Sequence, residues 1–145
     1  MTPPCFLEPG EATEYTRTIT AEDIRAFCAI SGDDDPVHTD EEFSRGTAFG
    51  RIIAHGALVM GLLSTTASLM SRRSVGRGAT ATPVSAGYDR IRFTRPVFAG
   101  ETLTARYVIE AVDAERGRTR AALKIVNQDG ETCLVGTHIL AWVEV

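Results

Sequence analysis

The octapeptide SGDDDPVH, residues 31–38, places three consecutive carboxylates beside one imidazole. Asp33 and His38 stand five positions apart, with Pro36 between them. A carboxylate and an imidazole that meet in a cleft can take a proton from a water molecule and deliver one elsewhere. The same octapeptide is also compatible with an acidic turn that faces solvent, or with a cation-binding loop.

The cation-binding alternative has little support in the sequence. An EF-hand loop requires glycine at its sixth position, and counting from Asp33 the sixth residue is His38. A mixed carboxylate–imidazole site would need further ligands at a suitable spacing. Cys5, Cys28 and Cys133 are widely separated, so they predict neither a disulfide framework nor a zinc site. We therefore expect no metal and no bound cofactor.

The overall composition is that of an ordinary globular protein. The chain has 145 residues, of which 43% are hydrophobic and 23% charged, and we expect one domain over residues 1–145. The formal net charge is −4 without a basic block, which argues against a nucleic-acid partner. The N-terminus does not resemble a signal peptide, and no apolar run reaches the ~18 residues of a membrane span. We expect a cytoplasmic protein without a membrane partner.

Sequence patterns around the octapeptide predict how it is positioned. Thr20 and Asp23 form a capping-box pattern, and Gly32 follows the last apolar position, so a helix should deliver the chain to Asp33. A structured loop is expected over residues 33–53, with a short helical turn near residues 40–46. A short strand is expected before the helix, over residues 14–20.

The remainder of the chain predicts one buried helix and a sheet. Residues 55–70 are small or apolar almost all round, and the first charge after them is Arg72, which is typical of a helix buried on most sides. Antiparallel strands are expected over residues 84–98, 101–112, 118–126 and 131–145. One apolar helix and one sheet predict an α+β fold in which the sheet wraps the helix.

Two segments, residues 31–64 and 88–103, resemble the MaoC-like hydratase family, which includes (R)-specific enoyl-CoA hydratases and acyl dehydratases. The resemblance extends over residues 15–145. It implies the hotdog fold, with an antiparallel sheet around one long central helix, and a homodimer or higher homo-oligomer. The matching positions are Ser31-Gly32-Asp33, Pro36, His38, Asp40, Phe49-Gly50, Ile53-Ala54-His55-Gly56 and Ser64.

The resemblance implies a role for three of these residues in particular. Asp33 and His38 fall on the family's catalytic pair, and Gly56 falls on its oxyanion-hole position. A main-chain N–H in the first turn of a helix has no acceptor within the helix, so Gly56 could stabilise negative charge on a thioester oxygen. Glycine also lets that thioester approach the backbone closely.

Three further residues are candidates for binding the substrate. Asp35 stands where the family commonly has asparagine, and because an ionised carboxylate only accepts hydrogen bonds, this departure affects how the catalytic pair is oriented. For His55, the alternative to substrate binding is a supporting structural role. Ser64 either lines an acyl tunnel or bonds back to its own helix.

The function implied by the resemblance is hydration of trans-2-enoyl-CoA to (R)-3-hydroxyacyl-CoA, or the reverse dehydration. The substrate would be a thioester of CoA or of acyl carrier protein. Two alternatives remain open: an acyl-CoA thioesterase of the same fold, and a non-catalytic subunit that binds acyl-CoA.

Overall fold

The computed structural model describes residues 4–144, and residues 4–11 form neither helix nor strand. Helices and strands then follow one another in the order β1 (Ala12–Thr18), α1 (Ala21–Ser31), α2 (Pro36–Thr39), α3 (Glu41–Arg45), α4 (Gly56–Gly76), β2 (Thr82–Phe93), β3 (Thr102–Asp113), β4 (Arg118–Val126) and β5 (Thr132–Val143).

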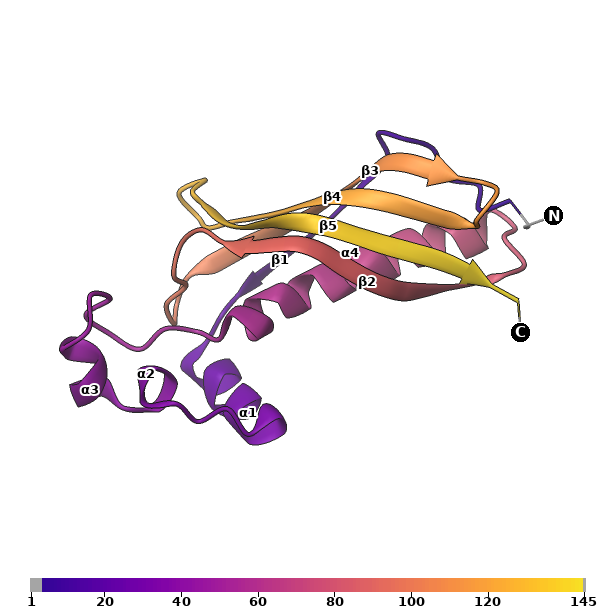
Figure 1. Cartoon of the computed structure of the whole chain (residues 1–145). Helices are drawn as coiled ribbons and strands as arrows, with labels where there is room; N and C mark the ends of the chain where they lie inside the picture. The colour runs from indigo at the N-terminus through magenta and orange to yellow at the C-terminus, as the bar shows by residue number, and fades with distance from the viewer. Residues whose placement is uncertain (1–3, 145) are drawn as a thin grey trace.

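The five strands form one antiparallel sheet in the order β1-β3-β4-β5-β2, and α4 lies along one face of it (Figure 1). Alternate residues of each strand face α4, as the two-residue period of a strand requires. On β3 these are Leu103, Ala105, Tyr107 and Ile109, none of them more than 1% exposed. The predicted α+β arrangement, a sheet wrapped around one helix, is confirmed.

Helix α4 is longer than its predicted span of residues 55–70. Arg73, which lies beyond the predicted span, donates hydrogen bonds to Glu11 and to the carbonyl of Ala12. Ser74 is buried, and its hydroxyl donates to the carbonyl of Cys5 at 2.6 Å. The polar end of the helix is therefore covered by the N-terminal segment, a contact that local hydropathy does not reveal. Within the described residues, no helix has the length and apolarity that crossing a membrane requires.

Strand β2 ends at Phe93, whereas residues 84–98 were predicted to be extended throughout. Its pairing with β5 shifts register between Asp89 and Arg92, and the chain then leaves the sheet. The carbonyl of Val97 accepts a hydrogen bond from the Ala54 N–H at 2.7 Å. This crossing attaches the segment before α4 to the end of the sheet.

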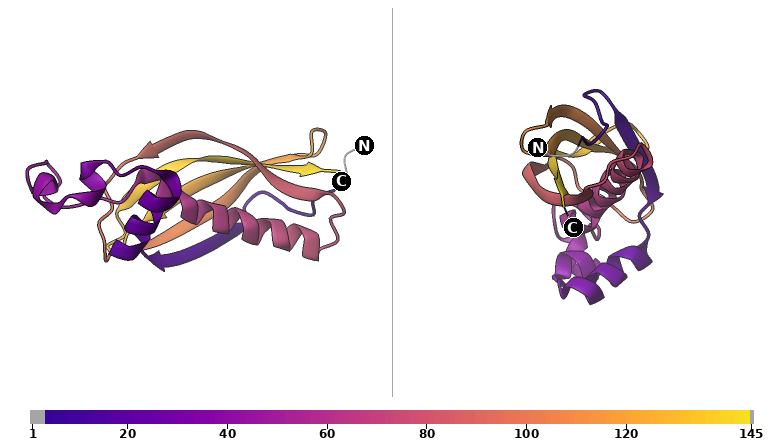
Figure 2. Two further views of the ribbon diagram at one scale, coloured as in Figure 1. Left: turned by 90° about the horizontal axis from the view of Figure 1, so that it is seen from below. Right: turned by 90° about the vertical axis from the view of Figure 1, so that its right-hand side faces the viewer.

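Helices α2 and α3 lie beyond one end of the sheet, and α1 lies next to the start of α4 (Figures 1 and 2). Helix α1 begins with the predicted capping box of Thr20 and Asp23. It ends at Gly32, whose φ of 79° is the left-handed conformation that glycine adopts at little cost. The Asp35 carboxylate caps α2 by accepting a hydrogen bond from the Val37 N–H at 3.1 Å.

Candidate active site

His38 is held by a hydrogen bond that fixes which ring nitrogen is available. Its Nδ1 lies 2.7 Å from the carbonyl oxygen of Ile53. A carbonyl oxygen can only accept, so Nδ1 carries the hydrogen, and Nε2 of the neutral ring has a free lone pair. The side chain is 11% exposed. His38 therefore presents one proton-accepting atom from a partly shielded position.

Asp33 lies beside that atom. Its Oδ2 is 3.9 Å from Nε2 of His38, close enough for one water molecule to contact both. The other carboxylate oxygen accepts the Asp35 N–H at 3.3 Å, and the Ser31 hydroxyl accepts the Asp33 N–H at 3.1 Å. The carboxylate is 53% exposed, so solvent reaches the pair.

His55 lies under the pair and supports it. The imidazoles of His38 and His55 are stacked, with centroids 3.8 Å apart. Nε2 of His55 donates to the main-chain carbonyl of Asp33 at 2.9 Å and lies 3.6 Å from the sulfur of Cys28. The residue is 2% exposed, and its Nδ1 is buried without a hydrogen-bond partner among the described residues. His55 thus connects the start of α4 to the loop that carries Asp33.

A cavity of about 450 Å³ opens beside His38 and the first turn of α4. Gly56 lies on its wall, at the positive end of the α4 dipole. The ring of Phe93 covers the α-carbon of Gly56 so closely that an added β-carbon would lie 2.7 Å from its Cζ. The lining is mostly apolar: His38, Phe49, Ile53, Ala54, Gly56, Ala57, Val59, Phe93, Thr94, Arg95, Pro96, Val97 and Cys133.

The structure brings Asp33, His38 and His55 together and places Gly56 beside His38 on the same cavity. Of the six candidates, His38 and Gly56 line the cavity, and Asp33 and His55 adjoin His38. The other two lie apart from this group: the Asp35 side chain caps α2, and Ser64 is exposed on α4. Their roles in substrate binding remain predictions.

Ligand atoms of Asp33, His38 and His55 lie within 4.8 Å of one another. One nitrogen of each imidazole is already used by a main-chain carbonyl. A cation there would need additional ligands from water or substrate, because no other His, Cys, Asp or Glu of residues 4–144 joins the group. The arrangement suits a water molecule between two proton acceptors better than a metal ion.

Two contributions to the site were not identified from the sequence. The carbonyl of Ile53 sets the tautomer of His38, and the ring of Phe93 packs on Gly56. The first has no signal in residue types, because any residue supplies a carbonyl. The second had only a weak signal, an aromatic residue within the strand predicted over residues 84–98.

Comparison with known proteins identifies the family of this chain. A profile of the MaoC like domain matches residues 7–129. The chain belongs to the MaoC-like dehydratase family. Over 134 residues it is 29% identical to an (R)-specific enoyl-CoA hydratase of Aeromonas caviae, covering 92% of this chain and 94% of that protein. It is 30% identical to a 3-hydroxybutyryl-CoA dehydratase of Methylorubrum extorquens, covering 92% and 75%.

Solved structures of this family share the fold. The (R)-hydratase of A. caviae involved in PHA biosynthesis superposes with a TM-score of 0.80 at 28% identity, over 94% of this chain and 98% of that chain. An R-hydratase of Pseudomonas aeruginosa, in its unliganded form, gives 0.78 at 30% identity, over 99% and 87%. The expected hotdog fold is confirmed.

Proposed function

We propose that this protein catalyses the (R)-specific addition of water to a trans-2-enoyl thioester, and the reverse dehydration. The observation that carries the proposal is the lone pair of His38 Nε2 facing the Asp33 carboxylate 3.9 Å away, at the cavity that Gly56 lines. The named activities of the relatives, which are hydro-lyases, support it.

Hydration requires a base for water and a place for negative charge. A water molecule between Asp33 and His38 gives up a proton to one of them as its oxygen bonds to Cβ of the substrate. The electrons of the double bond move towards the thioester carbonyl, which becomes an enolate oxygen. That oxygen is stabilised by the Gly56 N–H. Transfer of a proton from the pair to Cα then completes the 3-hydroxyacyl thioester and returns the pair to its starting state, and dehydration follows the same steps in reverse.

The two sides of the cavity are suited to different parts of the substrate. The mostly apolar wall suits an acyl chain, whereas the polar groups are confined to the end near His38. Phe93 must move from the α-carbon of Gly56 before a thioester oxygen can approach that N–H from the same side. Because the ring is 55% exposed, such a movement needs no rearrangement of the core.

The deciding experiment uses crotonyl-CoA with a thiol reagent present. Hydration removes the absorbance of the conjugated double bond without releasing thiol, and chiral analysis should identify (R)-3-hydroxybutyryl-CoA. Release of thiol would instead indicate a thioesterase. Thermal stabilisation by acyl-CoA without any turnover would indicate a binding subunit. A series of longer enoyl thioesters, on CoA and on acyl carrier protein, would then define the substrate.

A further inference from the structure

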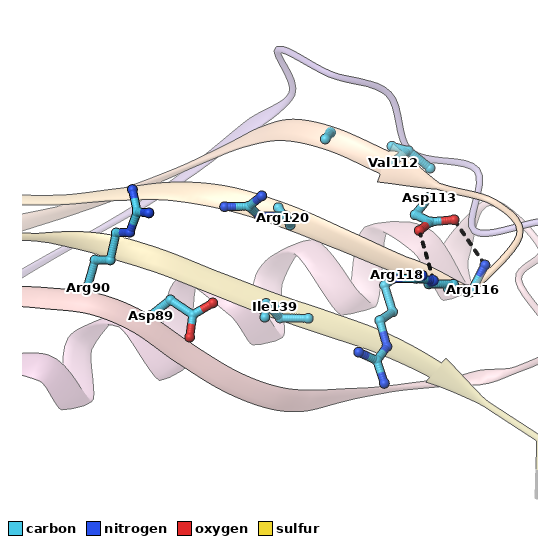
Figure 3. A pocket seen from close by; sticks show the side chains of 9 residues that line it. Asp89, Arg90, Val112, Asp113, Arg116, Arg118, Arg120 and Ile139 are labelled. Carbon is cyan, nitrogen blue, oxygen red and sulfur yellow. Dashed lines mark hydrogen bonds and ion pairs between the residues drawn. The ribbon is translucent and has the colours of Figure 1, made fainter.

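A second groove lies on the face of the sheet turned away from α4 (Figure 3). We call it the outer groove; its volume is about 600 Å³, and none of its lining residues lines the catalytic cavity. Side chains alternate between the two faces of the sheet along β4. Thr119 and Ala121 are buried on the face towards α4, so their neighbours on β4 point outward into the groove. The outer groove is lined by Asp89, Arg90, Ala111, Val112, Asp113, Arg116, Arg118, Arg120 and Ile139.

The charge of this groove is opposite to that of the whole chain. Four arginines and two aspartates line it, whereas the chain as a whole carries a net charge of −4. Arg116 is paired with Asp113 at 3.9 Å. Within residues 4–144, no carboxylate lies within ion-pair distance of the other three arginines, which are Arg90, Arg118 and Arg120.

Arg90 occupies a costly backbone conformation. Its φ of 53° lies in the left-handed region, which residues with a β-carbon rarely adopt. It stands within the irregular pairing between Asp89 and Arg92, and such bulges redirect side chains. In Figure 3 its side chain rises from β2 across β5 towards β4, the strand that carries Arg120. Strain of this kind is concentrated at functional sites.

The floor between the arginines is apolar. Ala111, Val112 and Ile139 contribute to it. A volume of this order is typical of pockets for small molecules. Guanidinium groups bind phosphate through paired N–H donors and also stack on flat rings. Unpaired arginines around an apolar floor therefore match a ligand with both phosphates and a planar ring.

We propose that the outer groove binds a phosphate-bearing small molecule of nucleotide size, with its phosphates on Arg90, Arg118 and Arg120 and its ring over Ile139. This site is separate from the catalytic cavity, which lies at the α4 side of the sheet. Its occupation does not depend on the proposed hydratase activity.

Calorimetric titration of the full chain at low salt tests the site, with ATP, ADP, AMP and inorganic tripolyphosphate as probes. We expect saturable binding with one site per chain. Affinity should increase with the number of phosphates and fall as salt is raised. ATP should bind more tightly than tripolyphosphate, because only ATP brings a ring.

Matched substitutions locate the site. Arg90→Gln and Arg120→Gln should each weaken ATP binding at least about tenfold, the usual scale for one charged hydrogen-bonding partner. Arg25→Gln removes the same charge from the exposed surface of α1 and should leave binding unchanged. Arg90→Gly is the sharpest variant: it should raise the melting temperature by ~3 °C by relieving the left-handed strain, while weakening binding like Arg90→Gln.

Three results would overturn the proposal. The first is the absence of binding by every probe at millimolar concentration while the variants and the wild type remain folded. The second is equal weakening by Arg25→Gln, which would indicate only diffuse charge attraction. The third is binding of acidic polypeptide or nucleic acid without binding of any small probe, which would make this face a macromolecular surface instead.

Discussion

At His38, the ring nitrogen nearest Asp33 is unprotonated in the neutral ring, because Nδ1 donates to the carbonyl of Ile53. Replacing either group of the pair should therefore remove proton transfer without disturbing the fold. We expect Asp33→Asn and His38→Ala each to lower kcat by at least ~10². Steady-state kinetics on crotonyl-CoA, with circular dichroism of each variant, measures both properties.

Asp34 provides the control for this experiment. It is exposed and adjacent to Asp33 in sequence, but its carboxylate is not part of the group that Asp33 forms with His38 and His55. Asp34→Asn removes the same charge from the same loop and should retain near-full activity. Full activity in Asp33→Asn, or an equal loss in Asp34→Asn, would contradict the assigned pair.

Gly56 should tolerate a methyl group structurally but not catalytically. The added β-carbon in Gly56→Ala would displace the exposed ring of Phe93, which has room to move, and would then occupy the approach to the N–H. We expect a fall in kcat/KM of at least ~10², the scale of losing one oxyanion donor. The melting temperature should change little.

The same helix supplies a comparison at Gly61. An added β-carbon there meets nothing within 4 Å, and the position is exposed. Gly61→Ala should raise the free energy of unfolding by about 0.5–1 kcal/mol through helix propensity, with activity retained. Unchanged activity in Gly56→Ala would remove the oxyanion assignment.

At the scale of single residues, the sequence pointed to side chains but not to the main-chain groups that contact them. The spacing of Asp33 and His38 around Pro36, together with the family resemblance, selected two residues whose side chains lie 3.9 Å apart. It did not reveal that the Asp35 carboxylate accepts from the N–H of Val37 two residues on and so caps α2. An aspartate before proline at the start of a helix is a normal capping pattern. Because it involves only neighbouring residues, this pattern is recognisable from the sequence alone.

At the scale of elements, His138 joins β2, β3 and β5 through a polar network. Nδ1 of His138 lies 2.9 Å from the Tyr107 hydroxyl, and its Nε2 lies 2.8 Å from the Ser85 hydroxyl. His138 is fully buried, and burial lowers its pKa from 6.5 to about 4. Burial also raises the pKa of Tyr107, so its hydroxyl remains protonated.

This network predicts a pH dependence of stability. The unfolded chain binds a proton at His138 below pH 6.5, and the folded chain does so only near pH 4, so acid favours unfolding. The free energy of unfolding should fall by about 2 kcal/mol between pH 7 and pH 5 from this residue alone. Urea titrations at pH 7, 6 and 5 measure it.

The variant His138→Gln isolates the effect. It keeps polar partners for both hydroxyls but does not titrate, so its stability should depend less on pH over this range, whatever its absolute value. Carboxylates contribute at lower pH: the hydrogen bond from Arg77 holds the pKa of Glu11 below 4.5. Parallel curves for the two proteins would contradict a neutral, buried His138.

The types of the elements were predictable because hydrophobic periodicity depends on residues that are close in sequence. The residues at which several elements end were not predictable. The capping box of α1 and the alternation along β3 depend on near neighbours in sequence. The last turns of α4 depend on Cys5 and Glu11, more than 60 residues away. The end of β2 depends on Val97 meeting Ala54, which only the folded chain brings together.

At the scale of the whole molecule, β2 is an edge strand of the sheet. Its outer edge is unpaired among the residues that the structure describes, and Val84 on it is 39% exposed. Proteins seldom leave such an edge open. We expect a homodimer through β2, with a dimer mass in light scattering at micromolar concentration.

A charge at that edge tests the interface. Val84→Lys should shift the mass towards the monomer. Thr16→Lys places the same charge on β1, the opposite edge of the sheet, and should leave the dimer intact. A wild-type monomer with full activity, or equal dissociation by both variants, would contradict pairing through β2.

The position of the proposed catalytic pair, outside the sheet, has a consequence for dynamics. Residues 33–39 are tied to the body by the Ile53 N–H to Val37, by His38 to Ile53 and by His55 to Asp33. Such a segment can open by local unfolding at a lower free energy than the sheet. Amide hydrogens of residues 31–45 should therefore exchange with deuterium well before those of β3 and β4. Bound substrate should slow the exchange of residues 31–45 and leave that of β3 and β4 unchanged. Activity can then be lost and regained on a timescale during which the sheet never unfolds.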